Sequence, residues 1–155
     1  MVADIKTDTN CAVSWRARPA SFVSLMSLYE SNYIRLGWLM PGLAALTSPL
    51  SVVSHVTGDC PLHLQVEERS RYTTTLTLTY VFADEAGLAC DPDLQIRVYH
   101  DAKLAEVQGC ARWHRHTLLE SLRSELARAL GERWLRNVML NKWLDYCVER
   151  GHRFS

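Results

Sequence analysis

Apolar side chains in the first part of this chain recur every three or four residues, the spacing of one helix face. Ser21 precedes the run and its hydroxyl can cap the first amides, while Pro41-Gly42 follows it and stops a helix. We therefore predict a helix over 22–40, followed by a linker or a short helical turn at 43–49. The apolar positions are Phe22, Leu25, Met26, Tyr29, Tyr33, Leu36 and Met40.

The middle of the chain alternates apolar and polar residues with a period of two. Such alternation predicts strands with one buried and one solvated face. Polar turns at 68–71 and 100–103 join neighbouring runs as two hairpins, which gives an antiparallel sheet of four to five strands. The predicted strands are 51–56, 62–67, 72–82, 94–98 and 104–107, with a loop at 84–93.

The last part of the chain returns to helical spacing. Thr117 to Glu120 fits a capping box, and a leucine stripe follows it as far as Gly131, which ends or kinks the helix. A second apolar stripe runs from Trp134 to Val148. The predicted fold class is α+β, an antiparallel sheet flanked by an N-terminal helix and a long C-terminal helix. Residues 1–18 are predicted to be a flexible tail and 19–155 a single domain.

Composition narrows the class of protein. The chain has 155 residues, of which 48% are hydrophobic, so one domain can fold without disulfides or metal. Its 17 basic and 17 acidic residues cancel, which disfavours nucleic acid and anionic membranes as partners. Charge is uneven along the chain. Residues 112–153 include nine basic and five acidic residues, whereas residues 59–93 include two basic and seven acidic residues. Five widely spaced cysteines and a polar N-terminus predict free thiols in a reducing, cytoplasmic setting.

The densest group of reactive side chains lies in 97–107. Arg97 and Tyr99 share one strand face, where a guanidinium beside a ring can hold a phosphate or carboxylate. His100 beside Asp101 resembles a base and its orienting acid, yet neighbouring strand residues point to opposite faces. A hairpin turn, in which Asp101 bonds the turn backbone and His100 is half buried, is the favoured interpretation of this pair. Glu106 completes the group.

The predicted turn at 68–71 supplies a second candidate group. Arg69, Arg71 and Tyr72 gather at one hairpin end beside several threonines, which suits an anion or a nucleotide phosphate. A solvated turn leading into a threonine-rich strand is the alternative interpretation.

Other chemistry has less support in the sequence. Cys60 and His63 form half of a zinc-like pattern, and 110–116 holds another half, but the paired knuckles of structural zinc sites are missing. Arg112 to His116 interleaves cations with Trp113, a pattern seen in single-strand binders, though it is short and the protein is neutral. Nucleophile signatures such as GxSxG and glycine-rich phosphate loops do not occur. We therefore predict neither a metal site, nor catalytic residues, nor a cofactor.

Several of these segments resemble the YqiB-like family of proteobacterial proteins, a family of unknown function. The resemblance rests on Arg71-Tyr72-Thr73-Thr74, on the run from Arg97 to Val107, on Asn32-Tyr33 to Pro41, and on Asn137 with Trp143, Leu144 and Cys147. Residues 116–120 depart from the family pattern, because the Tyr-Pro-Asn segment is missing. The resemblance implies a bacterial cytosolic protein and no particular activity.

Three functional hypotheses follow. The first is a non-catalytic protein-interaction or regulatory module with an unknown protein partner. The second is a protein that binds a small ligand, a nucleotide or another anion, and the third is an enzyme that uses His100 and Asp101. An edge strand also permits a homodimer. The candidate binding residues are Arg69, Arg71, Tyr72, Arg97, Tyr99, His100, Asp101 and Glu106.

Overall fold

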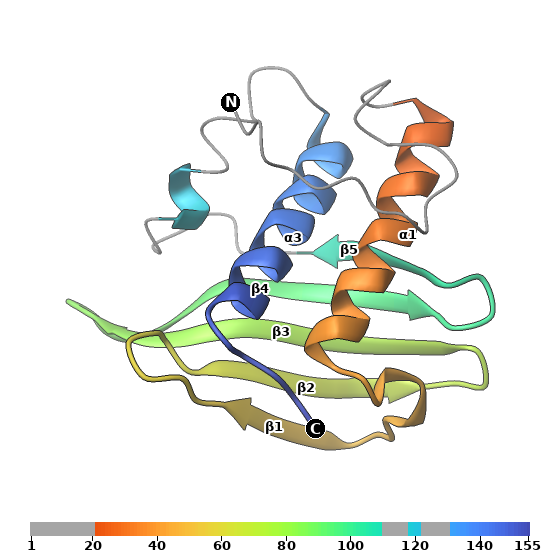
Figure 1. Cartoon of the computed structure of the whole chain (residues 1–155). Coiled ribbons are helices and arrows are strands. Elements are labelled where there is room, and N and C mark those ends of the chain that lie inside the picture. The colour runs from red at the N-terminus through yellow and green to blue at the C-terminus, as the bar shows by residue number, and fades with distance from the viewer. Residues whose placement is uncertain (1–20, 110–117, 122–130) are drawn as a thin grey trace.

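The computed structural model describes residues 21–109, 118–121 and 131–155, and it shows an antiparallel sheet with both long helices on one face (Figure 1). The five strands lie in chain order, so each pairs with its neighbour in sequence. This confirms the predicted α+β class. The predicted tail at 1–18 and the leucine stripe at 122–130 lie outside the described residues, as does Thr117 of the predicted capping box.

Helix α1 spans Phe22–Leu39, as its apolar spacing predicts. The Ser21 hydroxyl caps it by accepting a hydrogen bond from the Ser24 amide at 3.1 Å. Pro41 follows the helix, and the short 3-10 helix η1, Leu43–Ala45, connects it to the sheet.

All five predicted strands form, although their bounds differ from those predicted. They are β1 Leu50–Ser54, β2 Leu62–Arg69, β3 Thr73–Asp84, β4 Gly87–Tyr99 and β5 Leu104–Gly109.

The predicted loop at 84–93 is wrong, because β3 and β4 remain paired as far as Asp84 and Gly87. The Asp84 carboxylate accepts a hydrogen bond from the Ala86 amide at 2.8 Å, and Gly87 takes a φ of 118° that favours glycine. Pro92, which suggested a loop, lies where the register shifts, a position at which a strand tolerates proline.

The core lies between the sheet and helices α1 and α3, the second of which spans Glu132–Glu149. Gly131 is its N-cap with extended φ and ψ, and α3 begins directly after it. The predicted end or kink of a preceding helix at this glycine concerns 122–130, which lie outside the described residues. Trp143 is fully buried and meets the Tyr80 ring edge-on, with 5.3 Å between ring centroids. None of the described helices is both long and apolar enough to cross a bilayer.

A chain of buried polar side chains joins α1, α3 and β5. The Asn141 amide donates to Ser31 Oγ at 2.8 Å and to Asn32 Oδ1 at 3.1 Å. Asn137 Oδ1 accepts from the Val107 amide of β5 at 3.0 Å. Since these groups are buried, their mutual hydrogen bonds fix how the helices sit on the sheet.

Arg35 of α1 extends this polar chain toward the helix surface. The side chain of Arg35 is 2% exposed, and its Nε lies 2.9 Å from Asp145 Oδ1 of α3. Its guanidinium also lies over the Trp38 ring, 5.3 Å from the centroid. The ion pair therefore joins the two helices at a second point.

Candidate functional site

Three of the predicted binding residues meet on the sheet face away from the helices. Arg97 of β4 pairs in register with Glu106 of β5, and the Tyr99 hydroxyl donates to Glu106 Oε1 at 2.7 Å. The Arg97 guanidinium lies 6.0 Å from the Tyr99 ring centroid. Burial, with this bond to Glu106, raises the pKa of Tyr99, so the phenol stays protonated.

The same face continues across β3 and β2 as a polar surface. Glu67 accepts hydrogen bonds from Thr77 at 2.6 Å and from the Gln95 amide at 3.0 Å. Arg97 Nε is shielded from solvent and has no hydrogen-bond partner among the described residues. We call this surface the open face, and it consists of Glu67, Thr75, Thr77, Gln95, Arg97, Tyr99 and Glu106.

Arg69 lies at the end of the sheet and is engaged within the protein. Its Nη1 donates to Thr74 Oγ1 at 2.9 Å and its Nη2 donates to the Ala44 carbonyl at 3.0 Å. These bonds tie the β2–β3 hairpin to η1, which gives this arginine a structural role. Arg71 and Tyr72 are exposed nearby as a stacked pair, 5.1 Å from guanidinium carbon to ring centroid.

His100 and Asp101 are not arranged as a relay. His100 Nε2 lies 2.7 Å from the buried Thr74 hydroxyl, on the helix-covered side of the sheet. Asp101 is exposed in the turn that follows. A general base needs a substrate within hydrogen-bond reach, and this imidazole already bonds to the core. The geometry therefore gives the enzyme hypothesis no support.

The imidazole of His100 is expected to titrate below the ordinary histidine pKa of about 6.5. Burial lowers the pKa first and the Arg69 guanidinium adds to the effect, while Asp101 opposes it. The neutral form is thus favoured by folding, and its contribution to stability is lost as the pH falls through the folded pKa. In Arg69→Gln the pKa should rise, whereas in Arg71→Gln, the matched control, it should not change. An NMR titration of the His100 ring protons measures this pKa. Equal pKa values in wild type and Arg69→Gln would refute the effect assigned to Arg69.

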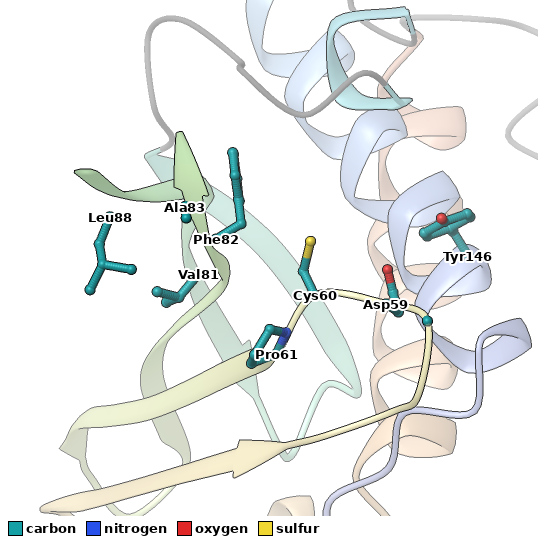
Figure 2. A pocket seen from close by; sticks show the side chains of 9 residues that line it. Asp59, Cys60, Pro61, Val81, Phe82, Ala83, Leu88 and Tyr146 are labelled. Carbon is teal, nitrogen blue, oxygen red and sulfur yellow. The ribbon is translucent and has the colours of Figure 1, made fainter. Parts of the chain in front are cut away.

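A pocket of about 690 Å³ lies at the opposite end of the sheet (Figure 2). The β1–β2 loop supplies Gly58–Pro61, the β3–β4 hairpin supplies Val81–Ala83 and Leu88, and α3 supplies Tyr146. Sequence reasoning did not find this site, because its residues come from three distant parts of the chain. The only local signal was the turn sequence Gly58-Asp59-Cys60-Pro61.

A buried polar network stands behind the pocket. Asp59 Oδ2 accepts from the Tyr80 hydroxyl at 2.9 Å and lies 2.8 Å from His152 Nε2. His152 Nδ1 lies 3.0 Å from Ser54 Oγ. These atoms resemble a Ser-His-Asp triad in their contacts, but Ser54 is 7% exposed and does not line the pocket. The group therefore holds the fold together.

Electrostatics agree with a structural role for this network. Burial alone would raise the pKa of Asp59, but the hydrogen bonds from Tyr80 and His152 outweigh it and hold the pKa below the usual value. Burial raises the pKa of Cys147 to about 12, so its thiol stays protonated.

Cys60 and His63, half of the zinc-like pattern, lie apart, and the other half at 110–116 is outside the described residues. Cys60 lines the pocket, while His63 pairs with Val53 and Thr79 in the middle of the sheet. The described residues contain no group of three or more His, Cys, Asp or Glu side chains that could hold a metal ion.

Comparison with known proteins gives a family without an assigned activity. The profile described as "Protein of unknown function (DUF1249)" matches residues 35–153. "Uncharacterized protein YqiB" of Escherichia coli strain K12 is 29% identical over 130 residues, which cover 84% of this chain and 90% of that protein. The proteins of the same name from strains O6:H1 and O157:H7 match equally well. The search of solved structures found no significant match.

Proposed function

Since this chain belongs to the DUF1249 family of proteins of unknown function, whose description carries no activity, we propose a function from its geometry: it is a non-catalytic module that binds a partner protein through the open face. The observation that carries the proposal is that α1 and α3 both pack on the other side of the sheet (Figure 1). Arg97, Tyr99 and Glu106 lie on the face away from the helices and are half-buried there, with the Tyr29 hydroxyl of α1 close to Glu106.

The side chains on the open face suit a protein partner. Tyrosine and arginine are enriched among the residues that dominate binding energy at protein interfaces. Here Tyr99 is held by its bond to Glu106, so little side-chain freedom is lost when it is covered. The Arg97 guanidinium lies over the Tyr99 ring, 6.0 Å from its centroid, so the two side chains are already arranged together.

The size of the face is also compatible with a protein. Five strands about 4.8 Å apart, each with about six residues of 3.4 Å rise, present roughly 500 Å². One side of a standard protein interface buries about 800 Å², so the face supplies more than half of it. The partner surface should be polar and rich in hydrogen-bond acceptors, because the face carries threonine, glutamine, tyrosine and arginine rather than aliphatic side chains.

The test is a quantitative pull-down with the full chain as bait. Arg97→Ala/Tyr99→Ala should reduce recovery of bound partners at least about tenfold, the equivalent of about 1.4 kcal/mol. Arg71→Ala/Tyr72→Ala is the matched control, because it removes the same residue types from another stacked pair at the sheet end. This control should recover partners as well as wild type does.

Other outcomes of the same experiment are equally informative. Equal recovery by wild type and the Arg97/Tyr99 variant would remove the open face as the binding surface. A bait that recovers only copies of itself, with a concentration-dependent mass in light scattering, would replace the proposed partner by a homodimer.

A further inference from the structure

We propose that the outer end of the β3–β4 hairpin is a second contact surface for the protein partner of the open face, and that it docks on apolar side chains flanked by lysine or arginine. The inference rests on the proposed function, since it assigns both surfaces to the same partner. The residues that carry it are Val81, Ala83, Leu88 and Cys90, which we call the arm patch.

The outer end of the hairpin extends beyond the neighbouring strands as an arm. The pairing of β3 with β2 ends at Tyr80, and the pairing of β4 with β5 begins only at Gln95. Residues 81–84 and 87–91 therefore form a two-stranded ribbon that projects past β2 and β5 (Figure 1). A ribbon in this position can reach a partner that lies over the sheet.

The arm patch lies on the same side of the sheet as the open face. Val81 and Ala83 continue the alternation that places Thr77 on the open face. Their partners in register on β4 are Cys90 and Leu88, and paired residues of antiparallel strands share a face. The outward side chains of β3 thus change from threonine to aliphatic residues where the arm leaves the sheet.

Water reaches most of the arm patch. Leu88 is 81% exposed, and Ala83 and Cys90 are exposed beside it. Val81 and Leu88 lie on one side of β3 and Phe82 on the other (Figure 2). A solvated strand face ordinarily carries polar side chains, and a contiguous group of exposed apolar ones marks an interaction site. The fold does not account for the patch, because none of its residues belongs to the described core.

The arm supplies area and apolar surface that the open face lacks. Two strands of about four residues add roughly 130 Å² to the roughly 500 Å² of the open face. The sum is closer to the roughly 800 Å² that one side of a standard interface buries. The centre of such an interface is more apolar than its rim, and Leu88 can provide that apolar part.

The charge of the arm indicates the chemistry of the surface on which it docks. Residues 81–93 contain no lysine, arginine or histidine, and their acidic residues are Asp84, Glu85, Asp91 and Asp93. Glu85 at the tip and Asp93 at the base of the arm are exposed. Lysine or arginine beside the apolar contact would complement these charges, whereas acidic residues there would be repelled.

An NMR titration of the full chain with three capped tetrapeptides tests this chemistry. The peptides are Arg-Leu-Leu-Arg, Glu-Leu-Leu-Glu and Arg-Ser-Ser-Arg. We expect saturable shifts of the Ala83, Leu88 and Cys90 amides with the first peptide, and at least about tenfold weaker binding of the other two. The proposal is overturned if no peptide shifts these amides, or if the acidic peptide binds as well as the basic one.

Two variants complete the titration. Leu88→Ser removes the largest apolar side chain of the arm at an exposed position and should weaken the first peptide at least about fivefold. Val23→Ser is the matched control, because Val23 is exposed on α1, on the other side of the sheet (Figure 1). An unchanged affinity in Leu88→Ser would overturn the arm as the binding surface.

The pull-down described for the open face separates the two proposals. The Leu88→Ser bait should recover the partners at least about fivefold less than wild type, while Val23→Ser should recover them fully. Full recovery by Leu88→Ser together with a loss in Arg97→Ala/Tyr99→Ala would overturn the arm and leave the open face. A loss in Leu88→Ser with full recovery by Arg97→Ala/Tyr99→Ala would overturn the open face and keep the arm as the binding surface.

Discussion

Replacing Asp59 with alanine is expected to lower the free energy of unfolding by about 3 kcal/mol, within the range for removing one partner of a buried charged network. The Asp59 side chain is 4% exposed. Its Oδ2 accepts a hydrogen bond from the Tyr80 hydroxyl and lies 2.8 Å from His152 Nε2. In the variant both partners lose their acceptor without gaining access to water. A buried donor left in this state carries the full cost of its desolvation.

Urea unfolding of wild type and variant measures this effect. Asp101→Ala is the control, because Asp101 is an exposed aspartate in a turn and its removal should change stability by less than about 0.5 kcal/mol. If Asp59→Ala were no more destabilising than Asp101→Ala, the network would not stabilise the fold as argued.

The same carboxylate predicts a pH dependence. Because the folded pKa of Asp59 lies below its usual value, the unfolded chain binds the proton first as the pH falls. The stability that Asp59 contributes is therefore complete above the ordinary aspartate pKa of about 4. It is lost as the pH falls through the folded pKa. Unfolding free energies measured between pH 6 and pH 3 should decline less steeply in Asp59→Asn than in wild type. Parallel declines would contradict the assignment.

The sheet was predictable because its faces differ in local sequence. Leu62, Leu64, Leu76 and Leu78 alternate with polar residues, and every one of them is buried. The end of the β3–β4 hairpin was not predictable in this way, since Pro92 interrupts the alternation there. Long-range pairing overrides that local signal, because β3 and β4 are already aligned by the rest of their length.

The candidate sites were predictable only in part. Arg97 and Tyr99 are two apart on one strand, so their common face follows from the period of two. The contacts of Asp59 with His152 and Tyr80 join residues that are 93 and 21 positions apart, and no local pattern contains them. His152 lies beyond the last predicted apolar stripe, which ends at Val148. Burial of a histidine after a helix end is a property of the tertiary structure alone.

Replacing Asn137 with alanine is expected to cost about 2–3 kcal/mol and to weaken β5 in particular. Asn137 is fully buried, and its Oδ1 accepts from the Val107 amide at 3.0 Å. The same Oδ1 accepts a hydrogen bond from the side-chain amide of Asn32 at 3.4 Å. Since β5 is an edge strand that pairs only with β4 within the sheet, this helix-to-strand bond helps to hold it. An alanine would leave the Val107 amide buried without an acceptor.

Hydrogen exchange distinguishes this local effect from general destabilisation. In Asn137→Ala, the Val107 amide should lose more protection than the Leu76 amide in the middle of β3, because only the former loses its partner. Gln108→Ala is the control, since Gln108 is the exposed neighbour of Val107 on the same strand. Equal losses at Val107 and Leu76 would show that Asn137 supports the whole core rather than this edge. The resemblance that singled out Asn137 in the sequence would then reflect overall packing, whereas a loss confined to β5 would assign it the attachment of the strand that carries Glu106.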